Sequence, residues 1–238
     1  MGSRTLTWPA GWIAEVRDDL DAAQRRDPAA RSRLEVLLTY PGVHALLLHR
    51  ISHRIDAAGW HLTARVMSHA ARMLTGVEIH PRAQIGHDFF IDHGMGVVIG
   101  ETTIIGNGCH LTQGVTLGGT STRREKRHPT LEDNVMIGAG AKIIGAVTIG
   151  EGARIGAGSV VVSSVPAGAT VVGVPGHIIA YTNRTNETVE RLPDPEWDRI
   201  DALERRIATL EAQLTAQSPD VRSAAVRDME PRVEGLTR

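Results

Sequence analysis

The chain has 238 residues, a formal net charge of −1, one cysteine and only 3% aromatic residues. A charge this close to zero argues against nucleic-acid binding through a basic field. A single cysteine excludes a disulfide framework and a multi-thiolate zinc site, and it suits a reducing compartment. Apolar runs are too short to span a bilayer, and the first thirty residues lack a secretory pattern. We therefore expect a cytoplasmic protein that binds neither nucleic acid nor membrane.

Residues 10–75 carry apolar side chains at spacings of three and four, which predicts helices. Asp27–Pro28 is typical of a helix start, with Asp as N-cap and Pro in the first turn. Pro41–Gly42 separates that helix from the next, and a further helix is expected over His61–Leu74. Residues 1–76 are therefore predicted to form a helical domain.

A six-residue repeat dominates residues 77–180, where 16 of the 25 glycines lie between Ile79 and Val162. The repeated aliphatic positions are Ile79, Ile85, Ile91, Ile99, Ile105, Leu111, Leu117, Leu131, Ile137, Ile143, Ile149, Ile155 and Val161. This period is a signature of a parallel β-helix, whose coils each contain three such units. Chance spacing in ordinary hairpins is disfavoured by the length of the repeat. We expect the aliphatic side chains to fill a narrow prism that has no room for aromatic rings.

The period fails twice, between Ile91 and Ile99 and between Leu117 and Leu131. Insertions in a solenoid become surface loops, so residues 92–98 and 118–130 are predicted to be loops. The second is basic and is either a solvated loop or a lid that binds an anion. Because the two insertions start between one and two coils apart, we expect them to lie side by side.

The region 181–238 is predicted to contain one helix, over about 196–217, and a disordered tail over 218–238. The helix carries a heptad seam of about two repeats, formed by Ile200, Leu203, Ile207, Leu210 and Leu214. A coiled coil between subunits and a helix packed on its own domain both remain open at this stage.

The titratable residues at the two insertions indicate the chemistry. His93 beside Glu78 or Asp92 forms the minimal general-base unit, because a carboxylate orients and stabilises the imidazole. Arg127 has the forked donors that suit a carboxylate ligand. Together they indicate an amino-acid-sized acceptor with a hydroxyl to deprotonate. No two histidines at i, i+4 have a carboxylate third partner at metalloenzyme spacing, so no metal is expected. Cys109 lies inside a repeat unit and is rejected as a nucleophile.

From about Arg26 to Ile179 the chain resembles the bacterial serine O-acetyltransferase family, which catalyses the first committed step of cysteine synthesis. The resemblance is carried by Arg26–Ala29, Leu74–Pro81, Ile91–Gly94, Val98–Thr102, Gln113–Thr120, Lys126–Pro129, Ile137–Lys142 and Gly173–Pro175. It implies an α+β protein in which a helical N-terminal domain precedes a left-handed parallel β-helix. It also implies a homotrimer or a dimer of trimers, with active sites between adjacent prisms.

The resemblance also implies roles for residues at matching motif positions. His93 would be the general base, with Glu78 as its partner acid where well-known members have Asp. Asp92 would hold the substrate ammonium, Arg127 its carboxylate, and His128 would help to position it.

Further residues are implied more indirectly. Asp27 matches an Asp that reaches the site from a neighbouring subunit, and Glu101 matches a supporting carboxylate. Acetyl-CoA would lie along the prism edge, near the backbone of Gly119, Ala139 and Ala157.

The implied reaction is direct acetyl transfer from acetyl-CoA to L-serine, giving O-acetyl-L-serine for cysteine biosynthesis. Homoserine or another hydroxy-amino acid is an alternative acceptor, because one methylene is only modestly discriminated by a pocket. A non-catalytic hexapeptide-repeat binding or structural protein is the alternative of a different class. Cysteine feedback inhibition is expected, whereas the sulfhydrylase complex of members that end in Ile is not, since this sequence ends in Arg238.

Overall fold

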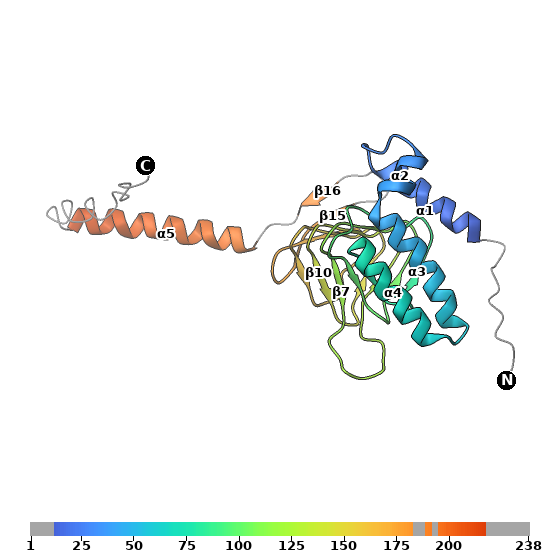
Figure 1. Ribbon diagram of the computed structural model, residues 1–238. Helices are drawn as coiled ribbons and strands as arrows, with labels where there is room; N and C mark the ends of the chain where they lie inside the picture. The colour runs from blue at the N-terminus through green and yellow to red at the C-terminus, as the bar shows by residue number, and fades with distance from the viewer. Residues whose placement is uncertain (1–11, 183–188, 192–194, 218–238) are drawn as a thin grey trace, which may run out of the picture. The chain divides into compact units, whose positions relative to one another are not determined.

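Helices come first in the chain, short strands follow, and a long helix comes last (Figure 1). The structure is a computed structural model that describes residues 12–182, 189–191 and 195–217. The chain divides into two compact units, Met1–Leu192 and Pro193–Arg238, which are considered separately. The disordered tail expected over 218–238 lies outside the described residues.

Four helices precede the strands: α1 (Trp12–Arg26), α2 (Arg33–Thr39), α3 (Pro41–Ala57) and α4 (His61–Thr75). The expected helix start at Pro28 is wrong. Oδ1 of Asp27 accepts a hydrogen bond from the Ala29 N–H at 2.8 Å, so its carboxylate caps a turn rather than a helix. The α2 helix is capped by Ser32 instead, whose Oγ accepts from the Glu35 N–H at 3.1 Å.

A buried ion pair ties the helices to one another and to the strands. Nε of Arg50 on α3 lies 2.7 Å from Oδ2 of Asp19 on α1, whose side chain is fully buried. Nη2 of the same arginine donates to the Gly86 carbonyl at 3.1 Å. Desolvation raises the pKa of the Asp19 carboxyl, and the hydrogen bond from Arg50 opposes that rise.

The strands form three parallel sheets wound as a three-sided prism. Sheet A contains β1 (Glu78–Ile79), β4 (Val98–Ile99), β7 (Thr116–Gly118), β10 (Lys142–Ile144) and β13 (Val160–Val161). Sheet B contains β2 (Gln84–Ile85), β5 (Ile104–Ile105), β8 (Thr130–Leu131) and β11 (Thr148–Ile149). Sheet C contains β3 (Phe90–Ile91), β6 (His110–Leu111), β9 (Met136–Ile137), β12 (Arg154–Ile155), β14 (Ala169–Val172), β15 (His177–Thr182) and β16 (Val189–Arg191). Only the last two of these run antiparallel to their neighbours.

The pairing register confirms the repeat and both insertions. Ile99 pairs with Leu117, and Leu131 pairs with Ile149, each one regular coil apart. The longer step from Leu117 to its partner Ile143 spans the loop over 118–130. The inserted residues therefore leave the stack of inward aliphatic side chains intact, and these side chains are buried except for the half-buried Ile85.

One expectation about the core is wrong, because Phe89 is fully buried within it. Phe89 stands at a corner of the first coil, and the same corner in later coils holds the smaller Cys109, Val135 and Ala153. The first coil has no strand coil beneath it, and α3 contributes Ala45 to the same cluster, so an aromatic ring fits there.

The prism ends in a turn over 173–176 that contains a cis Val174–Pro175 bond and connects β14 to β15. The second unit contains α5 (Pro195–Gln217), which matches the expected helix. No helix in the described residues is both long and apolar enough to cross a membrane.

Candidate active site

The expected site residues lie on two different corners of the prism. We call the corner that leads from sheet C to sheet A the C–A edge; it contains the inserted loop 92–97. The corner that leads from sheet A to sheet B is the A–B edge, and it contains residues 100–103 and the loop 119–129. The two edges are described in turn.

His93 and Asp92 stand on the C–A edge, directly after β3. His93 has a backbone φ of 58°, and its side chain is 72% exposed. Its Nε2 lies 3.9 Å from Oδ1 of Asp92. The start of α3 packs closely beneath this loop, because a Cβ on Gly42 would lie only 2.1 Å from the Ile91 carbonyl oxygen. A glycine is therefore needed where the helix meets the loop.

Asp27 and Tyr40 complete a polar group on this edge. The Tyr40 hydroxyl donates to Oδ2 of Asp27 at 2.5 Å. This hydrogen bond raises the pKa of Tyr40 to about 12 and lowers the pKa of Asp27. The charge of His93 also lowers the pKa of Asp27, and the charge of Asp92 contributes to the rise at Tyr40, so the two pairs interact electrostatically.

Within one chain, the charge of His93 acts on the Asp27 carboxyl and lowers its pKa. The expected contribution of Asp27 to the site of a neighbouring subunit stays a prediction. The turn after α1 and the short α2 fold the chain back, so that Asp27 and the Tyr40 at the start of α3 meet at the loop.

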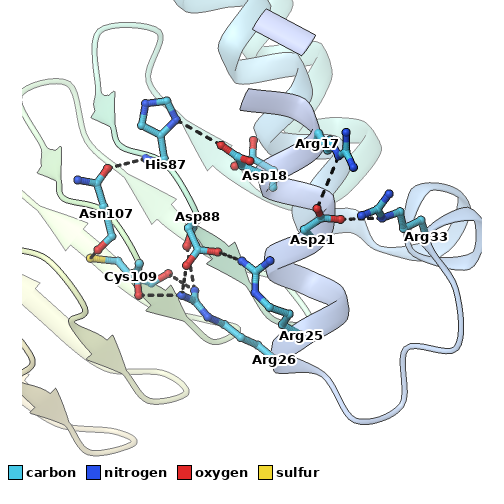
Figure 2. A network of polar contacts seen from close by, with 12 residues as sticks. Arg17, Asp18, Asp21, Arg25, Arg26, Arg33, His87, Asp88, Asn107 and Cys109 are labelled. Atoms are coloured by element: carbon cyan, nitrogen blue, oxygen red, sulfur yellow. Dashed lines mark hydrogen bonds and ion pairs between the residues drawn. The ribbon is translucent and has the colours of Figure 1, made fainter. Parts of the chain in front are cut away.

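A network at the end of α1 holds this segment against the prism (Figure 2). Arg26 donates to the carbonyl oxygens of Asp88 at 2.9 Å, Cys109 at 3.1 Å and Gly108 at 3.2 Å, and to the Asp88 carboxylate at 2.7 Å. Arg25 pairs with the other oxygen of the same carboxylate at 2.5 Å. These contacts join two successive coils to the residue that precedes Asp27.

Glu78 is the first residue of β1, in the sheet that leaves the C–A edge. Its Oε2 pairs with Nη1 of Arg72 on α4 at 3.0 Å. Within the described residues, its ion pair is thus with Arg72 rather than with His93.

The A–B edge carries Arg127 and Glu101. Nη2 of Arg127 donates to Oε2 of Glu101 at 2.6 Å. Partial burial raises the pKa of Glu101, but the hydrogen bond from Arg127 and the nearby His80 outweigh it, so the pKa is lowered. The guanidinium is therefore held in place by an ionised carboxylate.

Thr102 organises the rest of this edge. Its hydroxyl accepts hydrogen bonds from the backbone N–H groups of Arg127 and His128, each at 3.1 Å. Its own N–H donates to Nδ1 of His128 at 3.3 Å, which assigns the ring proton to Nε2. Burial, followed by the charge of Arg127, lowers the pKa of His128, so the neutral ring presents Nε2–H as a donor.

Two glycines make room for this ring. A Cβ on Gly100 would lie 1.9 Å from Cδ2 of His128, and one on Gly119 would lie 3.0 Å from its Nε2. Gly119 is thus placed beside Arg127 and His128.

A cavity of roughly 890 Å³ opens along the A–B edge. It is lined by Arg82, Gln84, Glu101, Thr102, Thr103, Ile104, Thr122, Arg124, Glu125, Lys126 and Arg127. Basic side chains outnumber acidic ones in this set, which favours an anionic ligand.

The two insertions do not lie side by side, contrary to the expectation. One lies between sheets C and A, the other between sheets A and B. The number of residues between two loops tells how many coils separate them. The corner that each loop occupies depends on which sheet contains the strand before it. The residues expected to contact acetyl-CoA divide likewise, with Ala139 and Ala157 on the C–A edge and Gly119 on the A–B edge.

Three residues of the site were missed by the sequence reasoning: Tyr40, Thr102 and Arg72. Tyr40 carried a usable signal, because it is one of only two tyrosines and lies next to the helix-breaking Pro41–Gly42. Thr102 and Arg72 act through tertiary contacts that no local pattern shows.

Cys109 stands outside these two edges. The Cys109 thiol is fully buried, and burial raises its pKa to about 11, which leaves it unreactive. Among the described residues, no group of three or more His, Cys, Asp or Glu side chains is arranged to hold a metal ion.

The prism with polar residues on its edges defines a hexapeptide-repeat transferase. The family described as bacterial transferase hexapeptide (six repeats) matches residues 128–163, which confirms the expected left-handed parallel β-helix. The family described as serine acetyltransferase, N-terminal, matches residues 5–47. The chain is 50% identical over 202 residues to the serine acetyltransferase of Bacillus subtilis, covering 84% of this chain and 93% of that protein. The chain therefore belongs to the serine acetyltransferase family.

Solved structures of serine acetyltransferases are similar to this chain in fold and sequence. The serine acetyltransferase of Neisseria gonorrhoeae in complex with serine has a TM-score of 0.67 and 45% identity, over 69% of this chain and 68% of that chain. The Brucella abortus serine acetyltransferase in complex with coenzyme A has a TM-score of 0.72 and 38% identity, over 74% and 70%.

Proposed function

We propose that this chain transfers the acetyl group of acetyl-CoA to the hydroxyl of L-serine, with His93 as general base. The product is O-acetyl-L-serine, a precursor for cysteine. The observation that carries this proposal is the gathering of His93, Asp92 and Asp27 on one exposed edge, in a family whose relatives bind serine and coenzyme A.

The reaction needs one proton to be moved. His93 takes the proton of the serine hydroxyl, and the resulting alkoxide attacks the thioester carbonyl. The tetrahedral oxyanion collapses, the carbon–sulfur bond breaks, and His93 returns the proton to the departing CoA thiolate. The Glu78 carboxylate stabilises the imidazolium after its ion pair with Arg72 has opened. No acyl-enzyme forms.

The substrate is held at its two charged ends. Asp92 and Asp27 bind the ammonium group, and the Tyr40 hydrogen bond orients the second of these carboxylates. Arg127 binds the substrate carboxylate, with Glu101 fixing the guanidinium and the Nε2–H of His128 adding a donor.

These two groups of residues stand on different edges, which supports a site that two copies of the chain complete together. A cyclic trimer of parallel prisms brings the C–A edge of one copy to the A–B edge of the next. The pantetheine arm of acetyl-CoA then lies between Ala139 and Ala157 of one copy and Gly119 of the other. The basic residues of the A–B cavity suit its phosphates.

The proposal extends to regulation and location. Cysteine shares the ammonium and carboxylate groups of serine, so we expect it to compete with serine for the same residues. We place the enzyme in the cytoplasm, because acetyl-CoA is made and used inside the cell.

The test is a thiol-release assay with wild type and with His93→Ala over serine, homoserine and related acceptors. We expect serine to be preferred, and the substitution to lower turnover by about 100- to 10,000-fold while the oligomer persists. Unchanged turnover would eliminate His93 as the base. A preference for homoserine would reassign the acceptor, and absence of turnover in the wild type would favour a binding protein. Titration with cysteine in the same assay checks the competition.

A further inference from the structure

The helix α5 carries an apolar stripe that the described structure leaves uncovered. The exposed fractions are 43% for Ile200, 55% for Leu203, 54% for Ile207, 41% for Leu210 and 59% for Leu214. These positions alternate spacings of three and four from Ile200 to Leu214 within the 23-residue helix, which is the a and d pattern of a coiled coil.

The charges beside the stripe indicate which partner covers it. With Ile200 and Ile207 at position a, Arg199 and Arg206 occupy position g. Glu204 and Glu211 occupy position e, on the other side of the stripe. Each side of the stripe thus carries one sign of charge.

This arrangement distinguishes the two orientations of a self-associated pair. In a parallel pair, position g of one helix faces position e of the next heptad on its partner, so Arg199 meets Glu204 and Arg206 meets Glu211. In an antiparallel pair, g faces g and e faces e, which places like charges together. The charges therefore favour the parallel orientation for a second copy of this helix.

Pairing within one helix does not account for two of these charges, those of Glu204 and Arg206. Glu204 has no basic residue three or four positions away, and Arg206 has no acidic one. In a parallel pair of α5 helices, the second helix places an opposite charge next to each of these two residues.

We propose that α5 is a self-association helix that pairs in parallel and in register with the α5 of other copies of this chain. Two heptads are too few to hold a coiled coil together alone, because isolated short helices are marginal. Copies that already assemble through their prisms supply the effective concentration that such a short seam needs. The pairing rests on the prism assembly proposed above, but it does not depend on the proposed chemistry.

Cross-linking in the full-length chain tests the orientation. Leu214→Cys places a thiol near the end of the seam, where a parallel in-register pair brings the two copies together and an antiparallel pair separates them. Ala212→Cys, on the outer face two residues away, is the matched control, and the natural Cys109 is buried. We expect mild oxidation to give a disulfide-linked dimer with Leu214→Cys and little with Ala212→Cys. Equal cross-linking of both variants, or of neither, would overturn the proposal.

Charge reversal in the Leu214→Cys chain tests the partner. Glu204→Arg with Glu211→Arg makes the stripe basic on both sides, and Arg199→Glu with Arg206→Glu makes it acidic. For each charge-reversed variant alone, we expect the yield of disulfide-linked dimer to fall to that of the Ala212→Cys control. In a mixture of the two variants, we expect the yield to recover, with each disulfide joining one chain of each kind. A cross-linking yield that charge reversal leaves unchanged would refute the parallel pairing. Turnover should stay at the wild-type level in all variants.

Discussion

At the residue scale, the site depends on how firmly Asp27 is placed. Its carboxylate is fixed from two sides, by the Ala29 N–H and by the Tyr40 hydroxyl. Its backbone follows Arg26, whose guanidinium makes four hydrogen bonds to the prism. Both kinds of contact fix the position of the carboxylate that we propose binds the substrate ammonium.

Arg26 is therefore expected to act as a positioning residue. Arg26→Ala should raise the KM for serine by about tenfold, because small displacements of binding groups are costly, and leave the KM for acetyl-CoA near wild type. Steady-state kinetics with both substrates varied will measure this.

Arg25→Ala is the matched control, since Arg25 contacts only the carboxylate of Asp88 in this network and is more exposed. If both substitutions raise the KM for serine equally, the anchoring of Asp27 by Arg26 is refuted. If Asp27→Asn itself has no effect on that KM, the proposed ammonium site is wrong instead.

At the scale of elements, α3 meets the prism through a buried titratable group. His49 on α3 is 5% exposed, and its Nδ1 has no hydrogen-bond partner among the described residues. Burial lowers its pKa to about 3, from an ordinary value of 6.5. The folded protein therefore holds this ring in its neutral form.

This burial makes stability depend on pH in a defined direction. Between about pH 6.5 and 3 the unfolded chain binds a proton at His49 that the folded chain does not, so acid favours unfolding. We expect the free energy of unfolding to fall by up to about 1.4 kcal/mol per pH unit below 6.5 through this group. Urea titrations at pH 7.5 and 5.5 will measure it.

His49→Gln should flatten this dependence, because a neutral side chain takes its place. His69→Gln removes an exposed histidine from α4 and should leave the dependence as in the wild type. An unchanged slope in His49→Gln would show that other groups cause the acid sensitivity.

At the scale of the whole molecule, the decisive feature is that the candidate site is split between two edges. Asp27, Asp92 and His93 stand on one, and Glu101 and Arg127 on the other. If each site takes one edge from each of two neighbouring copies, damage to different edges can be complemented.

Mixed oligomers of His93→Ala and Arg127→Ala chains should therefore regain activity. Random mixing in equal amounts leaves about a quarter of the sites with both intact residues. Co-expression with different tags, followed by the thiol-release assay, will measure the recovery. Activity no higher than the sum of the two single variants would mean that each site forms within one chain.

Much of this molecule is determined by local pattern. The six-residue period predicts the prism, because each unit must bury one aliphatic side chain, and the register from Ile99 to Leu117 follows that period. The same period marks both loops, and the motif around His93 predicts this residue as the general base. Local pattern failed at Pro28, where an Asp that caps a turn resembles one that caps a helix, and at Phe89, where the open first coil accepts a ring.

Only the tertiary structure decided which corner each loop occupies, and hence that His93 and Arg127 lie on separate edges. It also paired Glu78 with Arg72 and brought Tyr40 to Asp27. A repeat specifies the side chains that point inward, because their burial is the same in every coil. Contacts between outward side chains depend on distances in space that sequence spacing does not encode. The sequence by itself therefore determined the fold and the kind of chemistry, while three-dimensional packing decided how the site is assembled.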